Sequence, residues 1–230
     1  MAGSGFGTNF RITTWGETHG AGVGVVVDGC PAGLPLERED VQKYLDRRKP
    51  GQSKYTTQRK EGDQVEILSG IFEGRTTGTP ISMVVYNKDQ RSKDYSNIKD
   101  IYRPGHADFT FDMKYGFRDY RGGGRSSGRE TIGRVAAGAV AAKVLKELGI
   151  EIKAYAKAIA GIEVSKDHFD FAEMNNNPFN MPDKEAAKLV QEKADQMIKE
   201  MDSIGGIIEC QITGMPVGIG ETVFDKLDAE

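Results

Sequence analysis

The chain has 230 residues, of which 38% are hydrophobic and 28% charged, with 29 glycines and 8 prolines. This length and balance fit one large globular domain or two small ones, and they exclude collagen-like and proline-rich disordered chains. Cys30 and Cys210 have neither a CxxC partner nor a histidine at metal-ligand spacing, so we expect no disulfide and no metal site. No signal region or long apolar run is present, so we expect a cytoplasmic protein that does not enter a membrane.

Charge is unevenly distributed along the chain, whose formal net charge is -3. Residues 38–134 carry 20 Lys and Arg against 14 Asp and Glu, whereas residues 135–230 carry 10 against 17. A basic segment within an acidic protein favours a site for small anionic molecules over a nucleic-acid coat, which normally makes a whole domain basic. Ordinary solvated surface charge is the alternative interpretation.

The first half of the chain predicts strands around one helix. Residues 23–28 form a β-branched run that is closed by a glycine turn, which predicts a buried strand. Residues 37–48 predict a helix that ends before a Pro-Gly pair. Residues 64–72 and 81–86 predict two further strands, joined by a turn or a longer loop. Residues 87–125 lack the periodicity of a core helix, and so long an irregular stretch is usually functional when it is ordered.

The second half predicts helices and strands in alternation. Residues 127–149 begin with capping-box spacing and continue with apolar residues at helical intervals. This helix contains small residues that allow close packing: Gly133, Ala136, Ala137, Gly138, Ala141 and Ala142. Residues 151–159 predict a strand, and residues 208–212 alternate in polarity as a half-buried strand does. Residues 183–201 predict an amphipathic helix with these residues toward a core: Ala186, Val190, Met197 and Met201.

The elements together predict an α/β protein of the α+β type. Its hairpin-like strands favour mixed or antiparallel sheets with long functional loops, and they argue against a doubly wound parallel sheet. Residues 224–230 look like the opening of another amphipathic helix without a C-cap. We therefore expect the chain to end within a domain.

Two of the three histidines lie in glycine-rich, polar surroundings. They are His19 and His106, whereas His168 lies among charged residues and is expected at the surface. Histidine titrates near neutral pH, and glycine neighbours allow a substrate to approach it. A histidine in a loop is often only a surface residue, but these two are the candidates for proton transfer.

The strongest local pattern is Arg118-Asp-Tyr-Arg-Gly-Gly-Gly-Arg-Ser-Ser-Gly-Arg-Glu130. It places four arginines, three consecutive glycines and two serines before a predicted helix, where backbone N–H groups and the helix dipole favour an anion. The pattern matches neither a Walker A loop nor a Rossmann fingerprint, so it indicates neither ATP nor a dinucleotide. An ordinary glycine loop with a capping serine is the alternative. A second basic loop over residues 47–54 indicates a substrate with more than one anionic group.

Five segments carry a resemblance to a known family: Gly16-Glu-Thr-His-Gly20, Val27-Asp-Gly-Cys-Pro31, Arg47-Arg-Lys-Pro-Gly51, Arg103-Pro-Gly-His-Ala-Asp108 and the arginine-rich segment 118–130. In order and over essentially the whole chain, they resemble chorismate synthases. The resemblance implies a lyase that converts 5-enolpyruvylshikimate 3-phosphate to chorismate and phosphate by anti 1,4-elimination, the last step of the shikimate pathway to aromatic amino acids. It also implies a β-α-β sandwich, a homotetramer and reduced FMN as cofactor, with NADPH involved only indirectly as the source of the reduced flavin.

The same resemblance assigns roles to individual residues. His19 corresponds to the family's histidine beside the leaving phosphate, a general acid, and His106 to the histidine near the flavin, which protonates or stabilises its reduced form. The positions that match substrate contacts are Thr18, Arg48, Lys54, Arg103, Ser127 and Arg129. The positions that match a flavin-contacting segment are Arg125, Ser126 and Ser127.

The sequence departs from the family pattern in three ways. Thr18 replaces the usual Ser and keeps a hydroxyl, whereas Lys54 replaces a frequent Arg and keeps the charge without the forked donors. Family members also continue well beyond this length, with an Arg-His-Asp-Pro type motif, a carboxylate proposed as a base and much of the FMN site. We therefore expect residues 1–230 to form a single catalytic domain, incomplete at its C-terminus.

Two alternatives to an active lyase follow from the same residues. One is an inactive truncated form, and the other is a non-catalytic anion- or RNA-binding module that uses the Arg/Gly loop and its neighbouring aromatic side chains. The acidic composition favours the enzyme, which would bind a small molecule and neither nucleic acid nor membrane.

Overall fold

The computed structural model describes residues 3–57, 61–88 and 99–221, so the predicted helix at 224–230 lies outside the described residues. Two compact units, Met1–Val144 and Leu145–Glu230, are described separately below. The single domain expected over residues 1–230 stays a prediction. No helix in the described ranges is long and apolar enough to cross a membrane.

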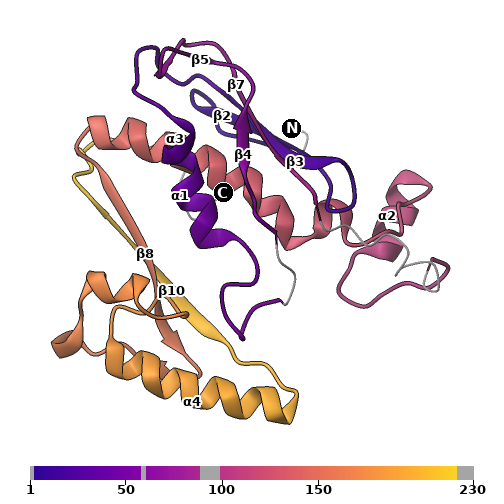
Figure 1. The fold of residues 1–230 in the computed structure, drawn as a ribbon, viewed down its shortest axis with the longest axis vertical. Coiled ribbons are helices and arrows are strands. Elements are labelled where there is room, and N and C mark those ends of the chain that lie inside the picture. The colour runs from indigo at the N-terminus through magenta and orange to yellow at the C-terminus, as the bar shows by residue number, and fades with distance from the viewer. Residues whose placement is uncertain (1–2, 58–60, 89–98, 222–230) are drawn as a thin grey trace. The chain divides into compact units, whose positions relative to one another are not determined.

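The first unit is built on a five-stranded antiparallel sheet with the strand order β1-β2-β3-β7-β4 (Figure 1). Its strands are β1 (Gly5–Phe6), β2 (Arg11–Gly16), β3 (Gly22–Asp28), β7 (Ile81–Tyr86) and β4 (Val65–Ile67). The central strands β3 and β7 confirm two predicted strands. Strand β2 was not predicted, because four of its six residues are polar or glycine.

The predicted strand over residues 64–72 is wrong in extent. Gly70 adopts φ +82°, and a Cβ there would lie 2.8 Å from the Cα of Ile81, so the chain turns at a position that only glycine fits. Strand β4 therefore ends before Gly70. The residues that follow form a separate hairpin of β5 (Ile71–Phe72) and β6 (Arg75–Thr76).

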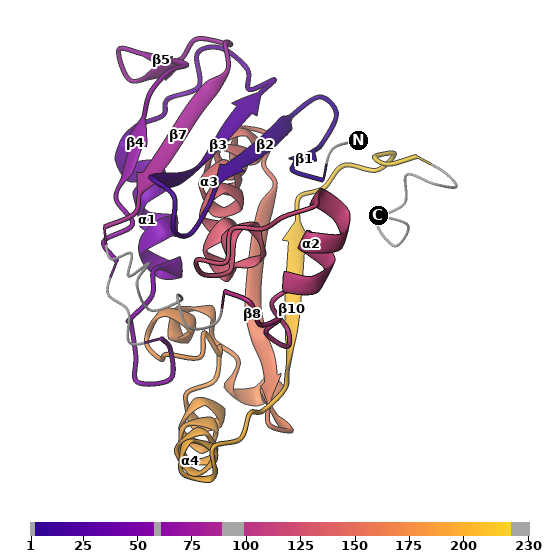
Figure 2. The ribbon, with the colours of Figure 1, turned by 90° about the vertical axis from the view of Figure 1, so that its right-hand side faces the viewer.

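Helices α1 (Arg38–Arg48) and α3 (Thr131–Glu147) cover one face of this sheet (Figures 1 and 2). The fully buried core residues include Val25, Val27, Leu45, Ile81 and Val140. Burial of each such side chain contributes about 1.5–3 kcal/mol of hydrophobic free energy. A Cβ at Gly133 of α3 would lie 3.0 Å from the carbonyl oxygen of Gly24, which confirms that a small residue allows close packing here.

The start of α3 differs from the predicted capping box. The Ser127 hydroxyl accepts from the Arg129 N–H at 3.3 Å, which caps the 3-10 turn η3 (Gly128–Glu130) that precedes the α-helix. The carboxylate of Glu130 does not return to the cap. It accepts from the Thr14 hydroxyl at 2.7 Å and from Arg134 at 2.9 Å, so it ties the helix start to β2 instead.

A short helix, α2 (Asp108–Tyr115), lies within the segment that was predicted to lack a core helix. Ala107 and Gly116, both with positive φ, bound it. Asp108 is its only buried residue, so the helix has no apolar stripe that a periodicity search would detect. The 3-10 turn η2 (Gly124–Ser126) follows further along the chain.

The second unit has a three-stranded antiparallel sheet with the order β10-β8-β9 and one long helix. Its elements are β8 (Glu151–Ile159), β9 (Ile162–Glu163), η4 (Lys166–His168), η5 (Phe171–Asn175), α4 (Lys184–Glu200) and β10 (Gly206–Thr213). The carboxylate of Asp183 accepts from two backbone N–H groups and caps α4. The predicted helix and both predicted strands are confirmed, and the antiparallel sheets confirm the α+β class.

Two expectations about burial in this unit are wrong. Met201, expected in the core, is 94% exposed because it adopts φ +53° and ends α4 as its C-cap. Strand β10, expected to be half buried, has Ile208 71% exposed. The alternating polarity correctly predicted a strand here, but it did not predict that the apolar side chains of the strand are exposed.

Candidate active site

His19 lies against the glycine-rich segment 121–128 although about a hundred residues separate them in sequence. The side chain is only 6% exposed. A Cβ at Gly122, which has φ +76°, would lie 2.2 Å from Cδ2 of His19, so only glycine allows the ring to occupy this position. The neighbouring Thr18 hydroxyl donates to the Gly124 carbonyl at 2.9 Å. Both residues therefore fix the segment next to the end of β2.

Asp119 completes the surroundings of His19. The Arg121 guanidinium donates to its carboxylate at 2.8 Å, and this hydrogen bond holds the pKa of Asp119 below its ordinary value. His19 is close enough to contribute to the same lowering when its imidazole is charged. A carboxylate near a buried imidazole stabilises its protonated form. Asp119 belongs to the conspicuous arginine-rich pattern, but nothing in the sequence predicts its proximity to His19.

Arg103 contacts the same segment directly and is held in place by Asp108. Its Nε and Nη2 atoms each donate to a different oxygen of Asp108, both at 2.9 Å, and Nη2 also donates to the Gly122 carbonyl at 2.7 Å. The hydrogen bond from Arg103 is the main cause that lowers the pKa of Asp108 to about 2. Arg118 lies 3.6 Å from the same carboxylate. Arg103 is thus held in place by an acid that stays ionised at neutral pH.

His106 lies on an exposed turn. Its Nδ1 atom is 3.1 Å from the Pro104 carbonyl, and because a carbonyl can only accept, this contact requires the proton on Nδ1. In the neutral form of the ring, Nε2 is then the acceptor. The backbone N–H of His106 donates to the carbonyl of Arg103, so the histidine is attached to the same turn as that arginine.

Arg48 and Arg129 meet on a single buried carboxylate, that of Asp63. Arg48 Nη1 donates to Oδ2 and Arg129 Nη1 donates to Oδ1, both at 2.8 Å, and the Asp63 side chain is 0% exposed. Arg48 also donates to the Thr131 hydroxyl at 3.1 Å and to the Gly128 carbonyl at 3.2 Å. Burial lowers the pKa of the Arg48 guanidinium, while Asp63 opposes this change. The last turn of α1 is thereby joined to the start of α3.

Asp63 was not among the predicted site residues, and its backbone is unusual. It adopts φ +41°, a conformation that costs a non-glycine residue about 1–2 kcal/mol. The buried side chain of Gln42 holds it there: Nε2 donates to the Asp63 carbonyl at 3.2 Å, and Oε1 accepts from the Val65 N–H at 3.0 Å. Nothing in the local sequence distinguishes this aspartate from an ordinary turn residue, because its partners come from distant segments.

The three residues that match a flavin-contacting segment lie just before α3. Ser126 is exposed, and a Cβ built at Gly124 or Gly128 meets no described atom within 4 Å. Exposed hydroxyl beside open backbone fits the close approach of a polar cofactor group. Arg125 points elsewhere. Its guanidinium donates to the Thr14 hydroxyl at 2.7 Å and to the Gly16 carbonyl at 3.1 Å, so it supports the segment by tying it to β2.

The structure therefore brings together most of the predicted residues. The contacts above join Thr18, His19, Arg48, Arg103, Ser127 and Arg129 around segment 121–128. His106 and Lys54 stand on exposed turns, and the Lys54 ammonium lies 5.1 Å from the centroid of the Tyr55 ring. These predicted residues form a polar cluster, in which many of the arginine donors bond to protein groups.

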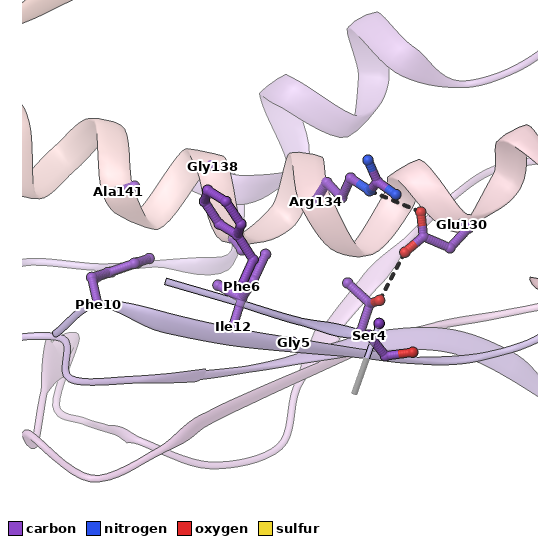
Figure 3. Close-up of a pocket in the computed structure, with 12 residues that line it drawn as sticks. Ser4, Gly5, Phe6, Phe10, Ile12, Glu130, Arg134, Gly138 and Ala141 are labelled. Carbon is purple, nitrogen blue, oxygen red and sulfur yellow. Dashed lines mark hydrogen bonds and ion pairs between the residues drawn. The ribbon is translucent and has the colours of Figure 1, made fainter. Parts of the chain in front are cut away.

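A separate pocket with a volume of about 520 Å³ lies between β1, β2 and α3 (Figure 3). Phe6, Phe10 and Ile12 line it on the strand side, and Gly138 and Ala141 line it on the helix side. One end is polar, where Glu130 accepts from Arg134. None of the predicted site residues is among its lining residues, so this pocket is distinct from the cluster around segment 121–128.

Comparisons with known proteins identify the relatives of this chain. A family model described as chorismate synthase matches residues 10–230. A curated chorismate synthase of Lachnospira eligens is 69% identical over 229 residues, which cover 100% of this chain and 63% of that protein. A chorismate synthase of Agathobacter rectalis is 63% identical and is covered to 62%. A crystal structure of a chorismate synthase, 31% identical, superposes with a TM-score of 0.72 over 93% of this chain and 60% of that chain. The chain thus spans about 63% of the length of these curated relatives.

Proposed function

This chain belongs to the chorismate synthase family, and on that premise we propose that the full-length protein is a phosphate-eliminating lyase. Its substrate is 5-enolpyruvylshikimate 3-phosphate, from which it removes phosphate and a ring hydrogen by anti 1,4-elimination to form chorismate, the last step of the shikimate pathway. We propose the activity for the whole protein and not for this chain alone, because the chain spans only 63% of its curated relative. We further propose that the whole protein acts as a cytoplasmic homotetramer.

The observation that carries this proposal is the convergence of three distant segments on residues 121–128 and on Arg129, which directly follows them. Thr18 and His19, Arg48, and Arg103 come from different parts of the chain, yet each contacts this stretch or a residue bonded to it. They combine a buried imidazole with cationic groups, which an elimination of phosphate requires for proton transfer and for binding an anion.

His19 is the proposed proton donor to the leaving phosphate. Its ring is almost fully buried against Gly122, so water has little access to it. Burial opposes charge on the imidazole, and the nearby Asp119 carboxylate would favour the charged imidazolium, which is the form that can give a proton. Protonation of the leaving group by such a residue accelerates a reaction by about 10²–10⁴-fold.

Arg48, Lys54, Arg103 and Arg129, together with Thr18 and Ser127, are the proposed ligands of the substrate's phosphate and carboxylates. An arginine presents five N–H donors in a fixed fork, so it can bond to a protein carboxylate and still offer donors to an anion. Arg103 and Arg48 use part of their forks on Asp108 and Asp63. The same acids keep the guanidinium groups in fixed positions before the substrate arrives.

Ser126 and Ser127, with the open backbone around Gly128, would hold part of the cofactor, while Arg125 supports them from β2. The chemistry that reduced FMN would supply when bound there is electron density for the substrate. His106 presents its Nε2 atom on an exposed turn and would hold a proton there next to the flavin. NADPH would serve only to reduce the flavin.

The alternative of an RNA-binding module has less support in this geometry. Arg118, Arg125 and Arg129 direct donors toward Asp112, Thr14 and Asp63. Single-stranded nucleic acid binding relies on exposed cations that track a phosphate backbone, and its affinity falls steeply with salt. Binding to RNA with a steep salt dependence would favour the module.

Phosphate release tests the proposed function directly. Full-length protein, 5-enolpyruvylshikimate 3-phosphate and chemically reduced FMN are mixed under anaerobic conditions, and phosphate and chorismate are measured together. We expect equal amounts of both products, and none when shikimate 3-phosphate replaces the substrate. Absence of both products with correctly folded protein would contradict the proposal. The 230-residue chain, assayed in parallel, tests the alternative of an inactive truncated form.

A further inference from the structure

Asp63 joins two of the proposed substrate-binding arginines, although it contacts no substrate itself. We propose that Asp63 is a positioning residue, which fixes Arg48 and Arg129 at the separation and orientation that the anionic substrate requires. This role rests on the proposed function, because it gives Asp63 an effect on substrate binding through the two guanidinium groups.

The carboxylate is the shared point of contact between the two arginines. Each of its oxygens accepts one hydrogen bond, at 2.8 Å from Arg48 and at 2.8 Å from Arg129. Arg48 ends α1 and Arg129 precedes α3, so tertiary contacts set the distance between them: the shared Asp63 carboxylate and the bonds of Arg48 to Gly128 and Thr131. Two like charges repel each other, and a buried carboxylate between them both cancels part of that repulsion and determines where each group lies.

The position of Asp63 is itself fixed from the backbone side. Its φ of +41° is uncommon for a residue with a Cβ, and such conformations persist only where surrounding contacts impose them. Gln42 supplies these contacts through bonds to the backbone on both sides of residue 64. The backbone that carries the carboxylate is therefore anchored by contacts other than the two arginines.

Arg129 shows that the arrangement leaves donors for a ligand. Its Nε donates to Asn87 at 2.8 Å and its Nη1 to Asp63, but the buried Nη2 atom has no hydrogen-bond partner among the described residues. Glu61 forms an ion pair with Nη2 at 3.8 Å, which is beyond hydrogen-bond distance. Most buried polar atoms have a hydrogen-bond partner, and a bound anion would supply one here. Arg48 keeps part of its side chain exposed, at 19%.

A purely structural role for the Asp63 carboxylate predicts a different change in kcat and KM from a positioning role. Loss of a structural bridge lowers stability and reduces the fraction of active protein, which changes the apparent kcat and leaves KM unchanged. Loss of a positioning group leaves the reacting atoms in place but misplaces two substrate ligands, which raises KM. The change in KM, compared with the change in kcat, therefore distinguishes a positioning role from a structural one.

The first test compares substitutions of two equally buried aspartates in the full-length protein. D63N removes the charge and keeps the shape, and D183N does the same at the cap of α4, where Asp183 is likewise 2% exposed. Both variants should melt at lower temperature. We expect D63N to raise KM for 5-enolpyruvylshikimate 3-phosphate at least tenfold with kcat within threefold, and D183N to change neither. An unchanged KM in D63N, or an equal rise in D183N, would overturn the proposal.

A second variant keeps the test valid if D63N folds poorly. D63G removes the carboxylate but also relieves the backbone strain at φ +41°, because glycine adopts this conformation freely. We expect D63G to fold and to show the same rise in KM. Wild-type KM in folded D63G would exclude a positioning role.

A measurement without turnover separates this inference from the proposed function. The Nε–H resonances of Arg48 and Arg129 are assigned by NMR with R48K and R129K, and the full-length protein is then titrated with inorganic phosphate. Both resonances should shift in wild-type protein and in D183N, and the shifts should be lost or need at least tenfold more phosphate in D63N. If wild-type protein shows these shifts but forms no chorismate, the proposed reaction fails and the positioning role stands. Identical titrations of wild-type and D63N protein would reject the positioning role even in an active enzyme.

Discussion

Arg129, beside the glycine-rich segment of the first unit, is 9% exposed, whereas Ile208, in strand β10 of the second unit, is 71% exposed. The usual relation between polarity and burial is thus reversed in both places. The informative observations in a protein are a buried polar group and an exposed apolar one, because each requires a reason. The buried arginine has its reason within the described structure, in Asp63 and Asn87.

Strand β10 is the opposite case, because the described structure does not explain the exposure of its isoleucines. It pairs along its whole length with β8, so its backbone satisfies the requirement of a strand, but its isoleucines are not covered by the described residues. Backbone hydrogen bonds to β8 therefore hold this strand, although its side chains are not buried. The site in the first unit therefore depends on individual polar contacts, and β10 depends on its ladder. Substitutions should have large effects in the first region and small ones in the second.

The largest effect is expected at His19. H19A removes the proposed proton donor and should lower kcat about 10²–10⁴-fold in the full-length protein, as measured by phosphate release under anaerobic conditions. H168A is the matched control, because His168 is an exposed histidine of the second unit and should keep the wild-type rate. A rate within threefold of wild type for folded H19A would show that the buried imidazole is structural.

The next effect is expected at Gly122, which the His19 ring contacts. G122A places a Cβ 2.2 Å from that ring and at φ +76°, so strain and overpacking together should cost about 3 kcal/mol of unfolding free energy. G116A is matched in φ, at +82°, but its Cβ meets no described atom within 4 Å, so it should cost about 1 kcal/mol. Urea unfolding measures both. Equal costs would mean that the ring can move aside freely.

A smaller effect, dependent on pH, is expected at Asp108. Its folded pKa of about 2 lies below the ordinary value, so the stability it contributes is present above about pH 4 and disappears as the pH falls through 2. D108N should therefore destabilise the protein by about 2 kcal/mol at pH 7, and the difference from wild type should vanish near pH 2. D28N, which breaks the exposed pair with Arg11, should cost less than about 0.5 kcal/mol at every pH. A loss at D108N that does not change with pH would exclude the ion pair as its cause.

The sequence predicted the regular elements of both regions because their signals are local. The runs at 23–28 and 81–86, and the periodicity of 183–201, are visible within single windows and correspond to observed elements. Helix α2 escaped because it has no apolar stripe, and β2 because its residues are mostly polar.

The residue types of the candidate site could be predicted from the sequence, but the hydrogen bonds between them could not. Glycines, arginines and His19 were conspicuous, and the structure does bring them together. The partners of the arginines were not predictable, because Arg125 bonds to Thr14 and Arg129 to Asp63 across 111 and 66 residues of sequence. A guanidinium that appears free to bind an anion in the sequence can be committed to a distant carbonyl or carboxylate. Only tertiary structure distinguishes these cases.

The smallest effect is expected in β10, and it tests the contrast between the two regions most sharply. I208T adds a hydroxyl where the side chain is 71% exposed, so it should change the unfolding free energy of the 230-residue chain by less than about 0.5 kcal/mol. V25T adds the same hydroxyl to the core of the first sheet, where the side chain is 0% exposed, and should cost about 1–3 kcal/mol. Urea unfolding of both variants measures the difference. A loss above 1 kcal/mol for I208T would mean that the isoleucine is covered in solution, because a hydroxyl is costly only where water cannot reach it.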